Sequence, residues 1–168
     1  MRILGIDPGS RITGYGVIDS DGVRSVYIGS GCIHVKANQM AEKLGIIFRE
    51  VDRIVKEHQP EELSVEQVFM SRNAASALKL GHARGAAICA VVNHKLPVSE
   101  YSPRTIKQAI VGTGAADKAQ VQHMVCRLLR LDDELQSDAA DALAAALCHA
   151  HTIATLRRFP AGVFRRAR

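Results

Sequence analysis

Four acidic residues stand where their neighbours predict apolar or neutral side chains: Asp7, Glu66, Asp138 and Asp141. Asp7 ends an apolar run, and Glu66 interrupts a strand-like segment. Asp138 and Asp141 lie in a segment rich in alanine and leucine. An isolated carboxylate in apolar surroundings is destabilising by roughly several kcal/mol unless it is paired or binds a metal. We therefore expect carboxylates from three separate segments to converge on a site for hard divalent cations.

Metal-assisted hydrolysis of a phosphodiester is the chemistry that such a site favours. Mg²⁺ prefers oxygen ligands, keeps several waters and is held by few carboxylates. Two ions about 3.5–4 Å apart can activate a water and stabilise the leaving oxygen. Without metal, four neighbouring carboxylates repel one another and titrate as a coupled group.

Each acid also has a structural interpretation that the residues leave open. Asp7 precedes a proline and a glycine, which is typical of a turn, and Glu66 could be a charge on an edge strand. Asp138 and Asp141 follow Ser137, a plausible N-cap, and the helix dipole favours acids in a first helical turn. From spacing alone, this interpretation of the helical pair is at least as strong as catalysis.

The elements that must position these acids follow from apolar periodicity and turn residues. We expect strands over residues 2–7, 13–19, 23–35, 63–68 and 97–101, and helices over 38–57, 74–93, 103–111, 117–131 and 137–157. In the helix over 117–131 the residues expected to face inward are Val121, Met124, Val125 and Leu128. The order βββαβαβααα predicts an α/β fold, a mixed five-stranded sheet with helices on both faces.

This order suggests how the acids meet. Pro8 keeps Asp7 extended at the end of the first strand, and Glu66 lies near the carboxyl end of the fourth. A helical connection makes the fourth strand parallel to its neighbour, so Asp7 and Glu66 become adjacent if the first and fourth strands pair. Asp138 and Asp141 are three residues apart and share one helix face.

Length and composition indicate one domain in the cytoplasm. The chain has 168 residues and a net charge of +5, which equals the five arginines from Arg157 to the end. We expect a single domain over 1–156 and a flexible basic tail over 157–168. No apolar run approaches the roughly 18 residues of a membrane helix, and the strand-like start predicts no signal peptide. The four scattered cysteines fit no metal pattern and are expected to be reduced thiols.

Basic and acidic segments are neighbours near the end of the chain. Residues 102–130 contain five basic residues other than histidine and only Asp117 as an acid, whereas 131–141 contain five acids and no base. This pattern suits a polyanion brought to a metal site, although solvated helix faces explain it equally well.

Five motifs together extend over nearly the whole chain. They are Gly5-Ile6-Asp7-Pro8-Gly9, Thr13-Gly14-Tyr15-Gly16, Glu66-Gln67-Val68-Phe69, Ala83-Arg84-Gly85 and Asp138-Ala139-Ala140-Asp141-Ala142-Leu143. With these motifs the chain resembles the RuvC family of Holliday-junction resolvases, the crossover junction endodeoxyribonucleases. The resemblance implies a ribonuclease H-like fold and a homodimer. It further implies paired symmetric nicks in four-way DNA junctions, with 5′-phosphate and 3′-hydroxyl ends, in homologous recombination and DNA repair.

The resemblance also assigns roles to residues and partners. Asp7, Glu66, Asp138 and Asp141 occupy the family's catalytic and metal-binding positions, although some members have histidine at the position of Asp138. The implied cofactor is Mg²⁺, which Mn²⁺ can replace, with two ions in the competent complex. The implied partners, besides junction DNA, are a hexameric branch-migration motor and its junction-binding protein.

DNA contacts are expected to be mainly phosphate contacts, because the chain has few aromatic residues with which to form a stacking platform. Lys107 and Lys118 resemble family DNA-contact positions, and the basic segment supports them independently. Phe69 could wedge into an opened base step or could pack under its own loop. Further candidates are Arg72, Lys79, Arg84 and Arg104.

Two other classes of protein fit parts of the pattern. Actin-like ATPases and sugar kinases also begin with a strand, an aspartate and a hairpin, but they need a second similar domain, and the chain shows no repeat. A non-catalytic junction-binding module would need the basic surface without four converging acids.

Overall fold

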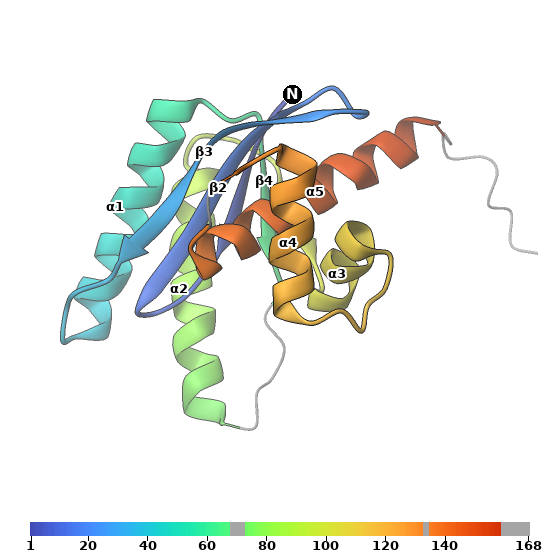
Figure 1. The fold of residues 1–168 in the computed structure, drawn as a ribbon. Helices are drawn as coiled ribbons and strands as arrows, with labels where there is room; N and C mark the ends of the chain where they lie inside the picture. The colour runs from blue at the N-terminus through green and yellow to red at the C-terminus, as the bar shows by residue number, and fades with distance from the viewer. Residues whose placement is uncertain (68–72, 133–134, 159–168) are drawn as a thin grey trace, which may run out of the picture.

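The computed structural model describes residues 1–67, 73–132 and 135–158, and Figure 1 shows the fold. The predicted order of strands and helices is confirmed. The elements are β1 (Arg2–Asp7), β2 (Ile12–Ser20), β3 (Ser25–His34), α1 (Met40–His58), β4 (Glu62–Glu66), α2 (Ala74–Val92), β5 (Val98–Tyr101), α3 (Pro103–Val111), α4 (Lys118–Leu129) and α5 (Ser137–Arg158).

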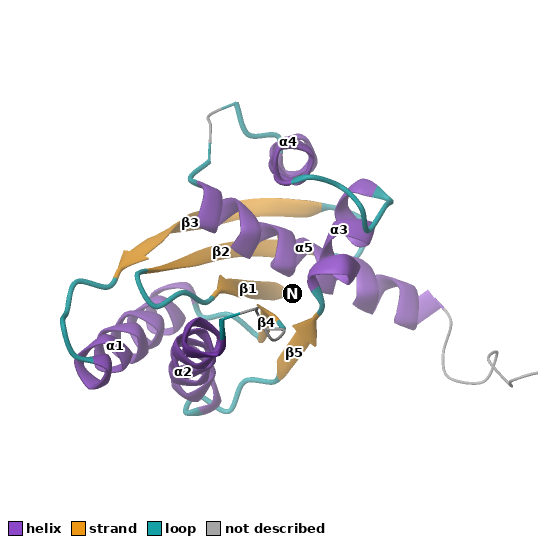
Figure 2. Ribbon diagram, turned by 90° about the horizontal axis from the view of Figure 1, so that it is seen from below, coloured by secondary structure: helices purple, strands orange, loops and turns teal. Residues whose placement is uncertain are grey.

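The five strands form one mixed sheet in the order β3-β2-β1-β4-β5. The first three strands are antiparallel neighbours, whereas β4 lies parallel to β1 and β5 parallel to β4. Figure 2 shows α1 and α2 on one face of the sheet and α3, α4 and α5 on the other. The predicted α/β fold with helices on both faces is therefore confirmed.

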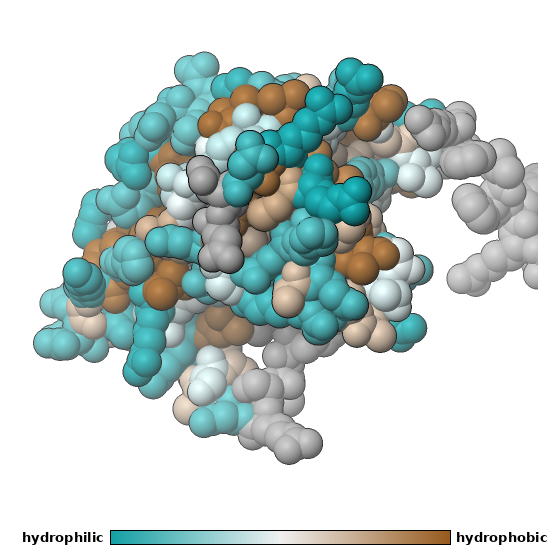
Figure 3. Space-filling model, in the orientation of Figure 1, coloured by the Kyte–Doolittle hydropathy of each residue, from teal (hydrophilic) through white to brown (hydrophobic). Residues whose placement is uncertain are grey.

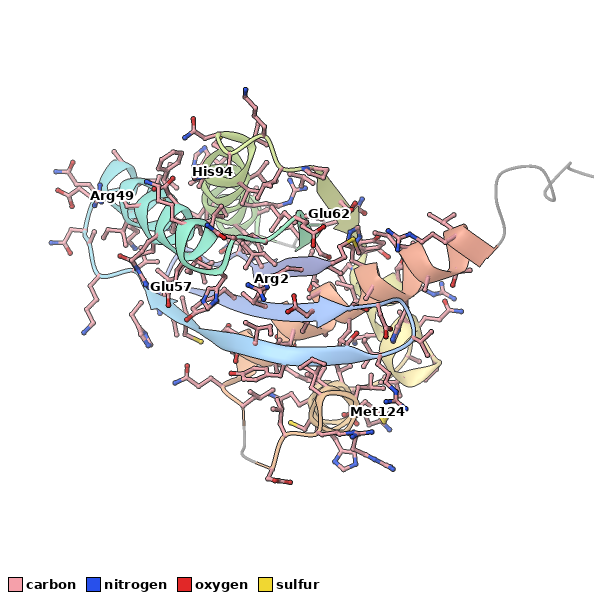
Figure 4. All side chains as sticks on the ribbon, turned by 90° about the horizontal axis from the view of Figure 1, so that it is seen from above. Arg2, Arg49, Glu57, Glu62, His94 and Met124 are labelled. Atoms are coloured by element: carbon pink, nitrogen blue, oxygen red, sulfur yellow. The ribbon has the colours of Figure 1, made fainter. Side chains whose placement is uncertain are left out.

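Strand alternation divides the core into two halves, one on each face of the sheet. Leu4 and Ile6 pack with the buried side chains of α1 and α2, whereas Ile3 packs with those of α3, α4 and α5. Arg49 on α1 and Met124 on α4 accordingly lie on opposite sides of the sheet in Figure 4. The odd-numbered residues of β1, Asp7 included, thus face α5.

Three glycines allow α5 to lie directly on β1 and β2. A Cβ atom would be 1.9 Å from the carbonyl oxygen of Ala142 at Gly5, and 2.0 Å from that of Asp138 at Gly14. At Gly16 it would be 2.5 Å from Cγ of Leu143. Any larger residue would therefore push the helix away from the strands. We call Gly5, Gly14 and Gly16 the glycine row.

Two details differ from the sequence-based predictions. Leu128, expected to face inward, is 37% exposed, and Leu129 is buried in its place. Both positions fit a period of 3.6 residues from Val125, so periodicity alone could not choose between them. In addition, α5 extends to Arg158 and includes the first two residues of the predicted tail, and residues 159–168 lie outside the described part.

In the part of the chain that the structure describes, every helix is too short or too polar to cross a membrane.

We predict that Gly5→Ala lowers the free energy of unfolding by about 3 kcal/mol, because its Cβ would overlap the backbone of α5. Urea denaturation measures the change. The control is Gly45→Ala on α1, where a Cβ would meet only the flexible end of Arg49. Equal stability of the Gly5→Ala protein and the wild type would show that α5 does not depend on this close approach.

Candidate active site

Asp7 and Glu66 lie side by side at the carboxyl ends of two neighbouring inner strands, β1 and β4. Ile6 is paired with Val65 on the parallel strand, so the next residues along the two strands, Asp7 and Glu66, are neighbours. Ser64, two residues before Glu66, donates its hydroxyl to the carbonyl oxygen of Ala145 on α5 at 2.7 Å. Alternation therefore places Glu66, like Asp7, on the face that α5 covers. The condition that the sequence analysis left open is therefore met, because the first and fourth strands are parallel neighbours.

The start of α5 brings the other two acids to the same end of the sheet. Gly14 is the pairing partner of Asp7 on β2, and the Asp138 carbonyl lies directly against Gly14. The carboxylates of Asp138 and Asp141 both lie close enough to Asp7 to raise its pKa. All four predicted acids thus converge, although they come from three separate segments.

Burial and mutual repulsion shift the pKa values of the two strand acids. Burial, followed by the charges of Asp141, Glu66 and Asp138, raises the pKa of Asp7 to about 7. Burial and then Asp141 also raise the pKa of Glu66. In both cases the Lys118 ammonium acts in the opposite direction. Asp7 therefore holds a proton for part of the time at neutral pH in the metal-free protein.

Lys118 is the cation that directly contacts the cluster. Its Nζ lies 2.7 Å from Oδ2 of Asp141, and this hydrogen bond raises the lysine pKa. Lys118 is the first residue of α4, whose N-terminus is fixed by a capping box between Asp117 and Gln120. The expected DNA-contact residue Lys118 is therefore held at the acids by a well-defined helix start.

A pocket of about 190 Å³ opens beside the cluster. Its polar lining consists of Glu66, Asp141, Lys107 and Lys118, and Ile106 is among its apolar residues. Lys107 and Lys118, which the sequence analysis expects to contact DNA, therefore share one cavity with two of the acids. A phosphate entering this pocket would meet both positive charges and the carboxylates at once.

A buried threonine fixes the loop after Asp7, and the sequence analysis did not find it. The Thr13 hydroxyl donates to the Gly9 carbonyl at 2.9 Å and lies 3.2 Å from the Gly9 N–H, which donates to it. Thr13 is fully buried. Its only sequence signal is its place in the Thr-Gly-Tyr-Gly motif, which does not reveal this contact.

The residues present fit a divalent cation by the chemistry of the donor set. Four carboxylates offer hard oxygen ligands, and their repulsion raises the pKa of Asp7, a shift that a cation would reverse. Among the described residues, no three His, Cys, Asp or Glu side chains form a ready-made metal-ligand cluster. In this structure the Lys118 ammonium provides the positive charge beside Asp141.

The other predicted DNA contacts are placed differently. Arg84 forms an ion pair of 2.5 Å with Glu100, and its buried Nε has no acceptor among the described residues. Lys79 on α2 and Arg104 on α3 are exposed. Phe69 and Arg72 lie outside the described residues.

Comparison with known proteins identifies the family. The family model described as crossover junction endodeoxyribonuclease RuvC matches residues 3–149. The chain belongs to the RuvC family. A RuvC protein of Photobacterium profundum is 61% identical over 154 residues, covering 92% of this chain and 89% of that protein. A RuvC protein of Methylococcus capsulatus is 58% identical over 157 residues, 94% of each chain.

Solved structures agree with this membership. Thermus thermophilus RuvC in complex with a Holliday junction substrate has a TM-score of 0.87 and 34% identity, covering 92% of this chain and 96% of that chain. The yeast mitochondrial Holliday junction resolvase Ydc2 has a TM-score of 0.70 at 12% identity, which shows a shared fold only. Membership of the RuvC family decides against the actin-like alternative.

The raised pKa of Asp7 predicts a pH-dependent stability. Because its folded pKa of about 7 lies above the ordinary value of 3.8, the contribution of Asp7 is fully present below about pH 4 and is lost as pH rises through 7. At pH 8 in EDTA we expect Asp7→Asn to be more stable than the wild type by roughly 1–3 kcal/mol.

Urea denaturation of both proteins at pH 5 and pH 8 measures this effect. The comparison cancels the titration of groups that the two proteins share. If the variant and the wild type lose the same stability between pH 5 and pH 8, Asp7 does not have the raised pKa that its surroundings imply.

Proposed function

We propose that this chain resolves four-way DNA junctions by paired, symmetric nicks. The observation that supports this proposal most directly is the convergence of Asp7, Glu66, Asp138 and Asp141, with Lys118 in contact with one of them. Family membership and the similar Thermus thermophilus complex support a Holliday junction as the substrate. We further propose that the nicks leave 5′-phosphate and 3′-hydroxyl ends and serve recombination and repair in the cytoplasm.

The four acids would hold Mg²⁺, or Mn²⁺ in its place, in a competent complex with two ions. Such ions lower the pKa of a bound water and stabilise charge on the leaving oxygen. Lys107 and Lys118, which line the pocket beside Glu66 and Asp141, would bind DNA phosphate near the cleaved bond. Thr13 and Ser64 position the loop after Asp7 and the middle of α5.

Paired nicks require two active sites, and we propose that a second copy of the chain supplies the other. The exposed side of α2 supports this arrangement, since it presents Leu78 and Val92, 62% and 53% exposed, with Ala75 and Cys89 along the same side. Its other side packs through Ala83, Ala87, Ala90 and Val91. Small and apolar residues at helical spacing allow two helices to pack closely.

Family membership also leads us to propose that the dimer works with a hexameric branch-migration motor and its junction-binding protein.

Incubation of a labelled four-way junction with and without Mg²⁺ tests the proposed activity. We expect symmetric nicks in two strands with Mg²⁺ only, and we expect Asp7→Asn to bind the junction without cutting it. Nicking by Asp7→Asn would remove Asp7 from the mechanism. Binding without nicking by the wild type would favour the non-catalytic junction-binding module.

Lys118→Ala should weaken junction binding and reduce its salt dependence. Each lost phosphate contact makes the negative slope of log K against log salt less steep by about 0.9. Fluorescence anisotropy in EDTA measures the slope, with Lys56→Ala as the control because Lys56 pairs with Asp52 on α1. An unchanged slope for Lys118→Ala would mean that Lys118 serves Asp141 and not DNA.

A further inference from the structure

An open groove of about 810 Å³ lies outside the acidic cluster, between α1 and the end of β3. Three segments line it: the loop after β1 with Arg11, the residues after β3 with Lys36, and the first half of α1 with Lys43 and Arg49. We call these four residues the groove cations. Glu42 is the acidic residue of the lining, so the formal charge is four minus one, or +3.

The groove cations lack the ion pairs that neutralise the rest of α1. Towards the end of that helix, Arg53 pairs with Glu50 at 3.1 Å and with Glu57 at 2.7 Å, and Lys56 pairs with Asp52 at 2.7 Å. Within residues 1–67, 73–132 and 135–158, no carboxylate forms an ion pair with a groove cation. Their positive charge is therefore available to a ligand.

A backbone hydrogen bond joins two of the segments that line the groove. The Val35 N–H donates to the Arg11 carbonyl at 2.9 Å, which ties the loop after β1 to the chain just before Lys36. A Cβ atom at Gly45 would lie 3.2 Å from Nη1 of Arg49, so the absence of a side chain there leaves room for the guanidinium. The loop after β1 and the chain after β3 are thus joined through the backbone beside α1.

The position of the groove relates it to the acidic cluster. The loop that contains Arg11 begins at Asp7, and Ile12 after it pairs with His34 on β3. The groove therefore lies at the same end of the strands as Asp7, beside the outer strand β3. Lys107 and Lys118, on α3 and α4, lie beside Glu66 at the end of β4. The two basic groups flank the acids from opposite sides.

The surface agrees with this placement. In Figure 1 the start of α1 lies at the lower left, next to the lower edge of the sheet, and hydrophilic side chains predominate over that region in Figure 3. Figure 4 shows Arg49 on the outer side of α1. A polyanion that passes over the acids and continues past β3 would enter the groove.

We propose that this groove binds the sugar-phosphate backbone of a junction arm, away from the bond that is cut. The proposal rests on the proposed junction-resolving function. DNA is favoured over an acidic protein segment because the groove lies at the same end of the sheet as the acids, and because cations from three separate segments line it. Arginine and lysine side chains on several segments suit successive phosphates of one strand.

The salt dependence of junction binding tests the groove. The groove variant Lys43→Gln with Arg49→Gln removes two cations and keeps polar side chains of similar length. The matched control, Arg53→Gln with Lys56→Gln, removes the same charge from the same helix at residues already paired with acids. In EDTA, with a long-armed junction, we expect the slope of log K against log salt to become less steep by about 1.8 for the groove variant, which loses two phosphate contacts. The slope of the control should stay unchanged.

Arm length decides where on the DNA the groove acts. With arms shortened to the minimum for a stable junction, the groove variant and the wild type should have equal slopes. A difference that persists on short arms would overturn the assignment to an arm. If the groove variant and the wild type have equal slopes on long arms, the groove is not a DNA site. That result is the one expected if the groove binds an acidic protein segment. If the groove variant fails to fold, the pair Arg11→Gln with Lys36→Gln replaces it.

Failure of the proposed function gives a different result. A wild-type protein that does not bind the junction, or binds it without nicking in Mg²⁺, contradicts the resolving activity itself. A wild type that binds and nicks, together with a groove variant of unchanged slope, contradicts only the groove.

Discussion

The close approach of α5 to β1 and β2 is the constraint on which the active site depends. At Gly5 and Gly14 a carbonyl oxygen of the helix occupies the space where a Cβ atom would stand, and at Gly16 the Leu143 side chain occupies it. Because the Asp138 carbonyl lies against Gly14, the pairing partner of Asp7, the first turn of α5 lies at the level of Asp7. A larger residue in the row would increase the distance between Asp7 and the pair Asp138 and Asp141, and the four carboxylates would no longer converge.

That approach places four acids where they repel one another, so the rest of the fold must hold α5 against their repulsion. Burial first, and then this repulsion, raise the pKa of Asp7 to about 7. Lys118 offsets part of it through its contact with Asp141. The same ammonium lines the pocket beside Glu66 and Asp141. In the proposed function the carboxylates would hold the metal, and Lys118 would meet phosphate in this pocket.

Much of this arrangement could be predicted because it depends on local patterns. A helical connection predicts that β4 lies parallel to its neighbour, and once that neighbour is β1, Asp7 and Glu66 come together without knowledge of side-chain packing. Asp138 and Asp141 were ambiguous, because a first helical turn favours acids for its own reasons. The fit of the glycine row to α5 depends on contacts between distant segments, as do the hydrogen bonds of Thr13 and Ser64. Periodicity also could not choose Leu129 over Leu128, because both lie on the inward side of an ideal helix.

The middle of α5 shows how the helix is kept in position. His149, buried on α5, hydrogen-bonds to the Tyr101 hydroxyl through Nδ1 and to Glu62 through Nε2, each at 2.7 Å. Ser64 holds the middle of the helix at Ala145. Both tethers attach α5 to β4 or β5, the strands on the Glu66 side, whereas the glycine row sets its contact with β1 and β2. A helix held along its length in this way can keep repelling charges together at its start, because displacing Asp138 or Asp141 would require breaking buried polar contacts well away from the acids.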